Sequence, residues 1–346
     1  MKGLVKLASG PGQMALMDVA ERHAGAGEVR LQVRAAALCG TDVLICKGLR
    51  EVAAPVILGH EFAGIVDEIG GGVTGVQLGD RVTSETDAFV CGTCVFCRAG
   101  DVQLCERRRA IGQSTDGGFA EAAVVPARGI HVLPESVDFI AGALTEPLAV
   151  AVHAAAERAR VQPGEWVAVV GPGTVGLLVA QVARAIGGEV TLAGLDRHAE
   201  RFRIGRDLGI GSAIRLDHPD DILAFREATR TEGSSGADIV IECSGTAEAL
   251  TACPQLVRRG GRVVLVGFYG ARLETPADQI VNGELSLIGS RGKRASSFNL
   301  GLQLLGDGRV DTAGLVTHSF PLAAWQEALE VAERSGTKVV FDRMVV

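Results

Sequence analysis

Hydrophobic and polar residues alternate along short segments of about the first 145 residues, as they do in strands with one buried face. The segment 28–37 (EVRLQVRAAA) alternates in this way, 62–69 is an apolar-rich run closed by three glycines, and 118–125 ends at a proline. This part of the chain is predicted to form an irregular, mostly antiparallel β domain.

The pattern changes at Glu146, where Pro147 suits a first helical turn and the alanine-rich segment 148–159 favours a helix. Strand-like and helix-like segments then alternate, with strands predicted at 167–171, 190–196, 237–243 and 262–267, and helices at 174–186, 198–208, 220–230 and 246–257. Such alternation predicts an α/β fold with a parallel sheet covered on both faces. The tail from about residue 290 is predicted to add helices at 296–305 and 322–335 and a last strand at 338–342.

Length and composition support two folded domains and exclude several partners. The chain has 346 residues, enough for two domains of ordinary size, and its 47% hydrophobic content is sufficient for packed cores. The net charge of −7, without a long basic stripe, argues against nucleic acid. Neither a secretory leader nor a run of about 18 apolar residues is apparent, so we expect a cytoplasmic protein that does not enter a membrane.

Four of the eight cysteines, Cys91, Cys94, Cys97 and Cys105, lie close together in the sequence. In a reducing compartment this spacing indicates a metal site more often than disulfides. Four thiolates would close a tetrahedral shell around zinc and leave no position for a substrate, so the zinc would be structural. The alternatives are an iron–sulfur cluster, although the spacing differs from the common ferredoxin patterns, and a pair of disulfides.

A glycine-rich motif between a predicted strand and a predicted helix indicates dinucleotide binding. Its glycines are Gly171, Gly173 and Gly176, with Thr174 and Val175 between them. The glycines permit a tight turn and a close approach of backbone N–H groups to a pyrophosphate at the helix N-terminus.

The choice of dinucleotide depends on Asp196, which ends the next predicted strand 20 residues after Gly176. A carboxylate there accepts hydrogen bonds from the ribose of NAD and repels the 2′-phosphate of NADP. Arg197 and Arg201 lie nearby and would favour NADP instead. We expect NAD, contacted also by Arg201 and by Val266 and Gly267, at the end of a later predicted strand.

The remaining candidates for chemistry are Cys39, the adjacent His60 and Glu61, and Glu146. Each also has an ordinary structural interpretation: a buried thiol, a capped histidine, and a carboxylate near a helix N-terminus. Spacing alone leaves open whether they share a metal ion.

The ordered motifs CGTD, GHEFAG, the four-cysteine segment, TEPLAV and GPGTVG resemble the zinc-dependent medium-chain dehydrogenase/reductase family of the alcohol dehydrogenase superfamily. Glu146 stands where other alcohol dehydrogenases have a cysteine, as in the sorbitol (L-iditol) and threonine dehydrogenase branch. The resemblance implies a GroES-like, mostly-β catalytic domain at 1–148, with a structural zinc lobe at about 88–108. It further implies a Rossmann NAD-binding domain at 149–289, a segment 290–346 that returns to the catalytic domain, and an active site between the domains.

The resemblance also implies roles for individual residues. Cys39, His60 and Glu61 would be ligands of a catalytic zinc, and Glu146 would be a fourth ligand or would accept a hydrogen bond from zinc-bound water. Thr41 would relay the proton of the alcohol.

The implied reaction transfers a hydride from a secondary alcohol of a small polyol, sugar derivative or cyclitol to NAD and gives a ketone. The alternatives are a threonine-type amino-alcohol dehydrogenase and a non-catalytic nucleotide-binding or redox-sensing protein. A homodimer or homotetramer is expected from the resemblance.

Two departures from the family pattern concern the substrate. Leu44 and Ile45 lie where the sorbitol and threonine dehydrogenases carry a histidine, which places the outer proton relay in question. The residues Gly292-Lys293, flanked by Arg291 and Arg294, replace a substrate-binding Arg-Tyr pair. These cations indicate either an oxygen-rich or anionic substrate or a solvated turn.

Overall fold

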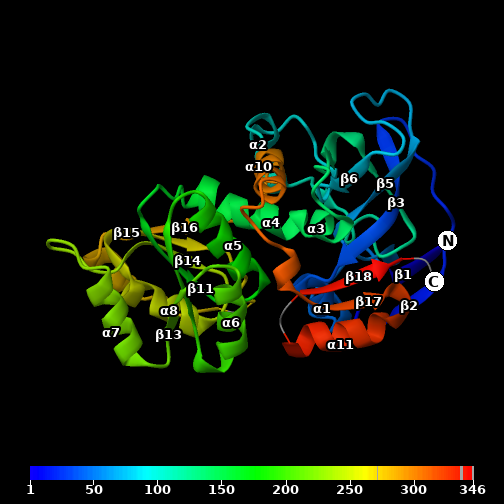
Figure 1. Cartoon of the computed structure of the whole chain (residues 1–346). Helices are drawn as coiled ribbons and strands as arrows, with labels where there is room; N and C mark the ends of the chain where they lie inside the picture. Colours follow the sequence, from blue (N-terminus) through cyan, green and yellow to red (C-terminus); the bar gives the residue numbers. More distant parts are fainter. Residues whose placement is uncertain (271, 336–337, 345–346) are drawn as a thin grey trace. The chain divides into compact units, whose positions relative to one another are not determined.

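The computed structural model describes residues 1–270, 272–335 and 338–344, which form two compact units (Figure 1). The first unit comprises Met1–Glu146, Arg294–Gly306 and Val316–Val346, apart from the residues not described, and the second comprises Pro147–Lys293 and Asp307–Leu315. The predicted tail 290–346 is therefore divided between the units: residues 290–293 and 307–315 belong to the second unit.

The first unit is built mainly from β-strands. Its strands are β1 (Lys2–Lys6), β2 (Met14–Asp18), β3 (Glu28–Ala37), β4 (Val56–Ile57), β5 (Glu61–Ile69), β6 (Arg81–Ser84), β7 (Asp87–Phe89), β8 (Arg109–Ala110), β9 (Ala122–Pro126), β10 (Ile130–Val132), β17 (Val316–Pro321) and β18 (Lys338–Arg343). Its helices are α1 (Gly40–Cys46), α2 (Val95–Arg98), α3 (Phe139–Ala143), α10 (Ala295–Gly306) and α11 (Trp325–Ser335). Short 3₁₀ turns lie at Val102–Leu104, Ala127–Gly129 and Leu322–Ala324.

Strand β3 organises the largest sheet of this unit. It pairs antiparallel with β5, β9 and β18, and the sheet runs in the order β10-β6-β5-β3-β18-β17. Its alternating residues bury Val29, Leu31 and Val33 in the core, because successive side chains of a strand point to opposite faces. At its end, Ala37 lies opposite Glu61 of β5 on one side and Val340 of β18 on the other. This register brings the first residue of β5 and the first half of β18 to the same end of β3.

The second unit contains a parallel six-stranded sheet. Its strands are β11 (Trp166–Val170), β12 (Glu189–Gly194), β13 (Ser212–Arg215), β14 (Ala237–Glu242), β15 (Val257–Leu265) and β16 (Ser286–Gly289). Its helices are α5 (Thr174–Ala185), α6 (Ala199–Asp207), α7 (Pro219–Ala228), α8 (Ala247–Leu256) and α9 (Ala277–Asn282), with 3₁₀ turns at Asp196–His198 and Ala313–Leu315. Helix α4 (Thr145–Val152) runs across the boundary between the units.

The strand order β13-β12-β11-β14-β15-β16 places the first strand in the middle, and the order reverses between β11 and β14. In doubly wound sheets a ligand binds at the carboxyl ends of the strands at such a reversal. The glycine-rich loop follows β11 and therefore lies at this point. The prediction of a β domain followed by a parallel α/β domain is confirmed, although β13 and β16 were not expected.

One predicted helix differs in detail. The segment 148–159 contains the end of α4 and then a π-helical turn at His153–Arg158.

None of the helices in the described part of the chain combines the length and the hydrophobicity that a membrane span requires.

Candidate active site and cofactor site

Three side chains from two segments meet in the first unit. Cys39 immediately precedes α1, His60 immediately precedes β5, and Glu61 is the first residue of β5. The sulfur of Cys39, one ring nitrogen of His60 and one carboxylate oxygen of Glu61 all lie within 4.8 Å of one another. His60 and Glu61 are buried. Cys, His and carboxylate ligands together suit zinc.

Asp42, in the first turn of α1, lies beside two of these residues. Its carboxylate accepts the Cys39 backbone N–H at 2.9 Å, and its other oxygen lies 3.8 Å from Nδ1 of His60. That oxygen and His60 Nδ1 are buried and have no hydrogen-bond partner among the described residues. Because an unpaired buried polar atom is costly, such atoms beside a set of metal-binding donors fit a site built around an ion.

The electrostatics of the site also fit a cation. Burial alone would lower the pKa of His60, but the negative charge of Asp42 and a hydrogen bond to Cys39 raise that pKa to about 10. Burial raises the pKa of Glu61, and the charge of Glu146 adds to this effect, whereas Lys338 opposes it. Three buried acidic groups and a thiol thus surround one histidine and one lysine. A divalent cation would balance this excess of negative charge.

Glu146, in the first turn of α4, is buried and acts electrostatically on His60, Glu61 and Lys338. Glu146 does not belong to the group formed by Cys39, His60 and Glu61, whose donor atoms all lie within 4.8 Å of one another. Thr41 lies closer to the thiol: its hydroxyl oxygen is 3.5 Å from the sulfur of Cys39.

Lys338 was not identified from the sequence. It is only 3% exposed, forms an ion pair with Glu61, and donates a hydrogen bond to the Leu38 carbonyl at 2.8 Å. Its position follows from the pairing of β18 with β3 beside β5. The one available signal was a lysine at the start of the apolar run KVVF, because a charged residue in a buried strand needs a partner.

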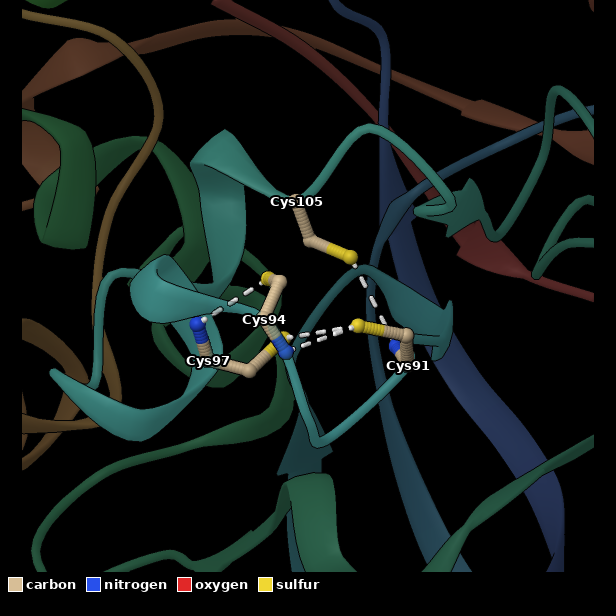
Figure 2. A group of neighbouring side chains, drawn as sticks. All are labelled: Cys91, Cys94, Cys97 and Cys105. Carbon is tan, nitrogen blue, oxygen red and sulfur yellow. Dashed lines mark hydrogen bonds between the residues drawn. The ribbon is translucent and has the colours of Figure 1, made fainter.

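The four clustered cysteines form a separate site in the first unit, shown in Figure 2. Their sulfurs all lie within 4.8 Å of one another, and backbone N–H groups donate to three of them: Cys94 N–H to Cys91 at 3.3 Å, Cys97 N–H to Cys94 at 3.4 Å, and Cys91 N–H to Cys105 at 3.5 Å. Hydrogen bonds from Thr93 and Cys94 lower the pKa of Cys91 to about 5. All eight cysteines lie in the described part of the chain and are free thiols.

The glycine-rich loop in the second unit is constrained at two of its three glycines. A Cβ at Gly176 would lie 2.0 Å from the Gly171 carbonyl oxygen, and Gly171 has φ +93° with Ser244 close by. A Cβ at Gly173 would meet no atom of the described residues within 4 Å. Packing therefore explains Gly171 and Gly176, whereas Gly173 leaves space for a ligand. No side chain in the described residues caps the start of α5, which leaves its first N–H groups available to an anion. Thr174 and Val175 open that helix.

The other predicted cofactor residues lie in the same unit. Asp196 follows β12, its side chain is 63% exposed, and its backbone N–H donates to the Asp217 carboxylate. Arg201 lies on α6, where burial, followed by the charge of Arg197, lowers its pKa. The backbone N–H groups of Val266 and Gly267 both donate to the carbonyl of Glu242.

Glu242 is a second residue that the sequence did not reveal. Its buried carboxylate, at the carboxyl end of β14, accepts hydrogen bonds from the Gly245 N–H at 3.0 Å and the Tyr269 hydroxyl at 2.9 Å. It thereby ties the loop after β14 to the loop after β15. The segment ADIVIEC carried the signal, since a carboxylate directly follows the apolar residues 239–241.

Of the cations expected near a substrate, Arg294 donates to Asp101 through Nε at 2.7 Å. This ion pair holds Arg294 against the four-cysteine segment within the first unit. Arg294 therefore has a structural partner in Asp101, and a role of these cations in substrate binding stays a prediction.

The chain matches two family models: the alcohol dehydrogenase GroES-like domain over residues 25–135 and the zinc-binding dehydrogenase domain over residues 174–307. It is 38% identical over 340 residues to a sorbitol dehydrogenase of Halalkalibacterium halodurans, covering 98% of each chain. Among solved structures it is similar to a zinc-binding dehydrogenase of Sinorhizobium meliloti 1021 bound to NADP, with a TM-score of 0.87, 30% identity and 98% of each chain covered. An alcohol dehydrogenase of Escherichia coli CFT073 in complex with NADH has a TM-score of 0.87 and 29% identity, covering 99% of this chain and 98% of that one.

Proposed function

Since the chain belongs to the zinc-binding dehydrogenases that carry an alcohol dehydrogenase GroES-like domain, we propose that it oxidises a secondary alcohol of a small polyol, sugar derivative or cyclitol to a ketone with NAD as the hydride acceptor. The observation that carries this proposal is the convergence of Cys39 with the buried residues His60 and Glu61 in one site. The likeness to a sorbitol dehydrogenase supports the substrate class.

The residues fit two zinc ions with different tasks. Cys39, His60 and Glu61 would hold a catalytic zinc, with Glu146 as a fourth ligand or as the acceptor of a hydrogen bond from its bound water. A zinc there supplies Lewis acidity, which lowers the pKa of a bound hydroxyl toward neutrality. Cys91, Cys94, Cys97 and Cys105 would hold a structural zinc in a closed shell.

The chain's own residues would position the substrate and carry its proton. Thr41, beside the Cys39 sulfur, accepts the hydroxyl proton of the alcohol and passes it outward. Leu44 and Ile45 have no titratable group, so a relay beyond Thr41 runs through other groups or solvent. Asp42 fixes the backbone of Cys39 and places a negative charge beside His60, and Lys338 holds Glu61.

The second unit would bind the dinucleotide. Gly173 and the start of α5 would hold its pyrophosphate, and Asp196 its adenosine ribose. Because the two solved relatives described above contain NADP and NADH, the preference for NAD rests on Asp196 and its surroundings.

A substrate panel tests the proposal. The protein is incubated with NAD and a series of polyols, sugars, cyclitols and amino alcohols, and NADH formation is followed by absorbance. We expect turnover with at least one polyol, sugar derivative or cyclitol. If the protein prefers threonine or a related amino alcohol, its substrates are amino alcohols and not polyols or sugars. If no alcohol gives NADH, the protein is non-catalytic.

Metal removal should separate the two zinc sites. We expect two zinc ions per chain, with mild chelation removing one of them together with activity while the circular dichroism spectrum is unchanged. The reason is that the three-donor site keeps an exchangeable position, whereas the four thiolates, supported by backbone N–H groups, form a closed shell. Metal analysis that finds a single zinc in fully active protein would disprove the two-site assignment.

The remaining proposals concern assembly and location. Strand β16 ends the described sheet, and hydrophobic side chains near it are exposed, notably Val281 and Leu287. We therefore propose a homodimer, or a homotetramer built from it, in which two such edges pair. Sedimentation velocity would reveal a monomer if this is wrong. We propose a cytoplasmic location, because none of the eight cysteines forms a disulfide.

A further inference from the structure

Arg215 is the last residue of β13. Like Arg197 and Arg201, it lies at the end of the sheet where the adenosine ribose is proposed to bind. Its Nη1 lies 3.7 Å from a carboxylate oxygen of Asp196. We propose that Asp221 keeps Arg215 from binding the 2′-phosphate of NADP, so that the Arg215–Asp221 pair, together with Asp196, determines the choice of dinucleotide. This inference rests on the proposed dinucleotide-binding function.

The hydrogen bonds between the two side chains use one of the two edges through which a guanidinium group can bind a phosphate. Arg215 donates through Nε to Oδ2 of Asp221 at 2.8 Å and through Nη2 to Oδ1 at 3.0 Å. Arginine binds phosphates through the same pair of parallel N–H groups. The backbone N–H of Arg215 also donates to Asp221 at 3.0 Å, which fixes the carboxylate in place. Asp221 therefore occupies one phosphate-binding edge of Arg215 and holds the guanidinium group in one orientation.

The pair lies beside Asp196, the carboxylate that is proposed to hold the adenosine ribose. Asp196 and Arg215 line a cavity of about 280 Å³ together with Asp221, Arg206 and apolar side chains of α6 and β13. If the carboxylate of Asp196 accepts the ribose hydroxyls, a phosphate on the 2′-oxygen enters the surroundings of Arg215. The same arginine would then be a good phosphate ligand if its donor groups were available.

The carboxylates beside Arg215 oppose a phosphate there, although Arg206, which also lines the cavity, is positively charged. Three carboxylates, those of Asp196, Asp217 and Asp221, lie near Arg215, and His218 Nε2 is 3.8 Å from Asp196. Hydrogen bonds from Arg215 lower the pKa of Asp221 to about 2, so the pair is fully charged in any ordinary assay. Removing the charge of Asp221 would both free the arginine and make its surroundings less negative.

The test compares NADH and NADPH binding by fluorescence titration of the zinc-loaded, full-length protein, without an alcohol substrate. Asp221→Asn keeps an acceptor for the Arg215 backbone N–H but removes the charge. We expect it to tighten NADPH binding by about tenfold relative to NADH binding. Arg215→Ala should give no such gain, and the gain should disappear in the double variant Asp221→Asn/Arg215→Ala.

Glu227→Gln is a matched control on the same helix, because Glu227 pairs with Arg230 at 2.8 Å through two exposed side chains and does not line the cavity. It should leave the ratio of the two affinities unchanged. Thermal unfolding of each variant checks its folding, and Asp221→Ala repeats the test if Asp221→Asn is unfolded.

A change of less than about threefold in the affinity ratio for folded Asp221→Asn, or a gain that persists without Arg215, would overturn the inference. Wild-type protein that binds neither NADH nor NADPH would instead contradict the proposed function. The two failures are therefore distinguishable.

Discussion

Cys39→Ser should abolish turnover while NADH binding is retained. A serine hydroxyl stays protonated near neutral pH and binds zinc poorly, so the set formed by Cys39, His60 and Glu61 loses its only thiolate. We expect a loss of at least about a hundredfold in kcat/KM, or about 2.7 kcal/mol of transition-state stabilisation. Because Cys39 belongs to the first unit and the glycine-rich loop to the second, a fluorescence titration should still detect NADH binding.

Cys46→Ser is the control for this experiment. Cys46 ends the same helix α1 that begins after Cys39, but it packs against the hydrophobic core and belongs to neither group of metal-binding side chains among the described residues. Its turnover should remain close to that of the wild type. If Cys39→Ser also kept turnover within about tenfold of the wild type, the catalytic-zinc mechanism would be wrong.

Lys338→Met should strongly destabilise the first unit. The substitution preserves much of the side-chain volume but leaves Glu61 as a buried carboxylate without its ammonium partner. Breaking a buried ion pair from one side costs about 3–5 kcal/mol in the free energy of unfolding. At about 2–4 °C per kcal/mol for a domain of this size, calorimetry should show a Tm lower by about 6–20 °C.

The loss should be larger in zinc-depleted protein than in zinc-loaded protein, because a bound divalent cation would also compensate Glu61. Lys338→Arg keeps the positive charge and should recover part of the stability. Lys47→Met is the surface control: Lys47 pairs with Glu333 at 2.6 Å, both side chains are about half exposed, and its loss should cost under about 1 kcal/mol. Equal effects of Lys338→Met and Lys47→Met would show that the buried pair does not stabilise the fold.

The family and the fold class followed from motifs whose residues are close in sequence. The glycine-rich loop was recognisable because a strand, three glycines and a helix lie within about 20 residues, and local geometry requires glycine at Gly171 and Gly176. Strands β13 and β16 were missed because both are short and partly exposed, so neither shows a clear alternation of apolar and polar residues.

Candidate residues were easier to name than their arrangement. Cys39, His60 and Glu61 were proposed together only through a resemblance, because spacing alone left a buried thiol and a capped histidine as equally ordinary interpretations. Asp42 and Arg215, taken as single residues, carry no signal in the sequence. Their importance depends on the partners that the fold brings to them, at distances that no local pattern encodes.

The sequence by itself determined the order of the domains, the parallel sheet, the four-cysteine segment and the glycine-rich loop, because periodicity, turn chemistry and ligand spacing act over a few residues. Only the tertiary structure decided that Lys338 meets Glu61 across 277 positions of the chain, and that Asp221 holds Arg215 beside Asp196. Both arrangements depend on which strands are neighbours and in which register they pair. Burial then makes the charges of these residues interact strongly, and burial is a property of the folded chain.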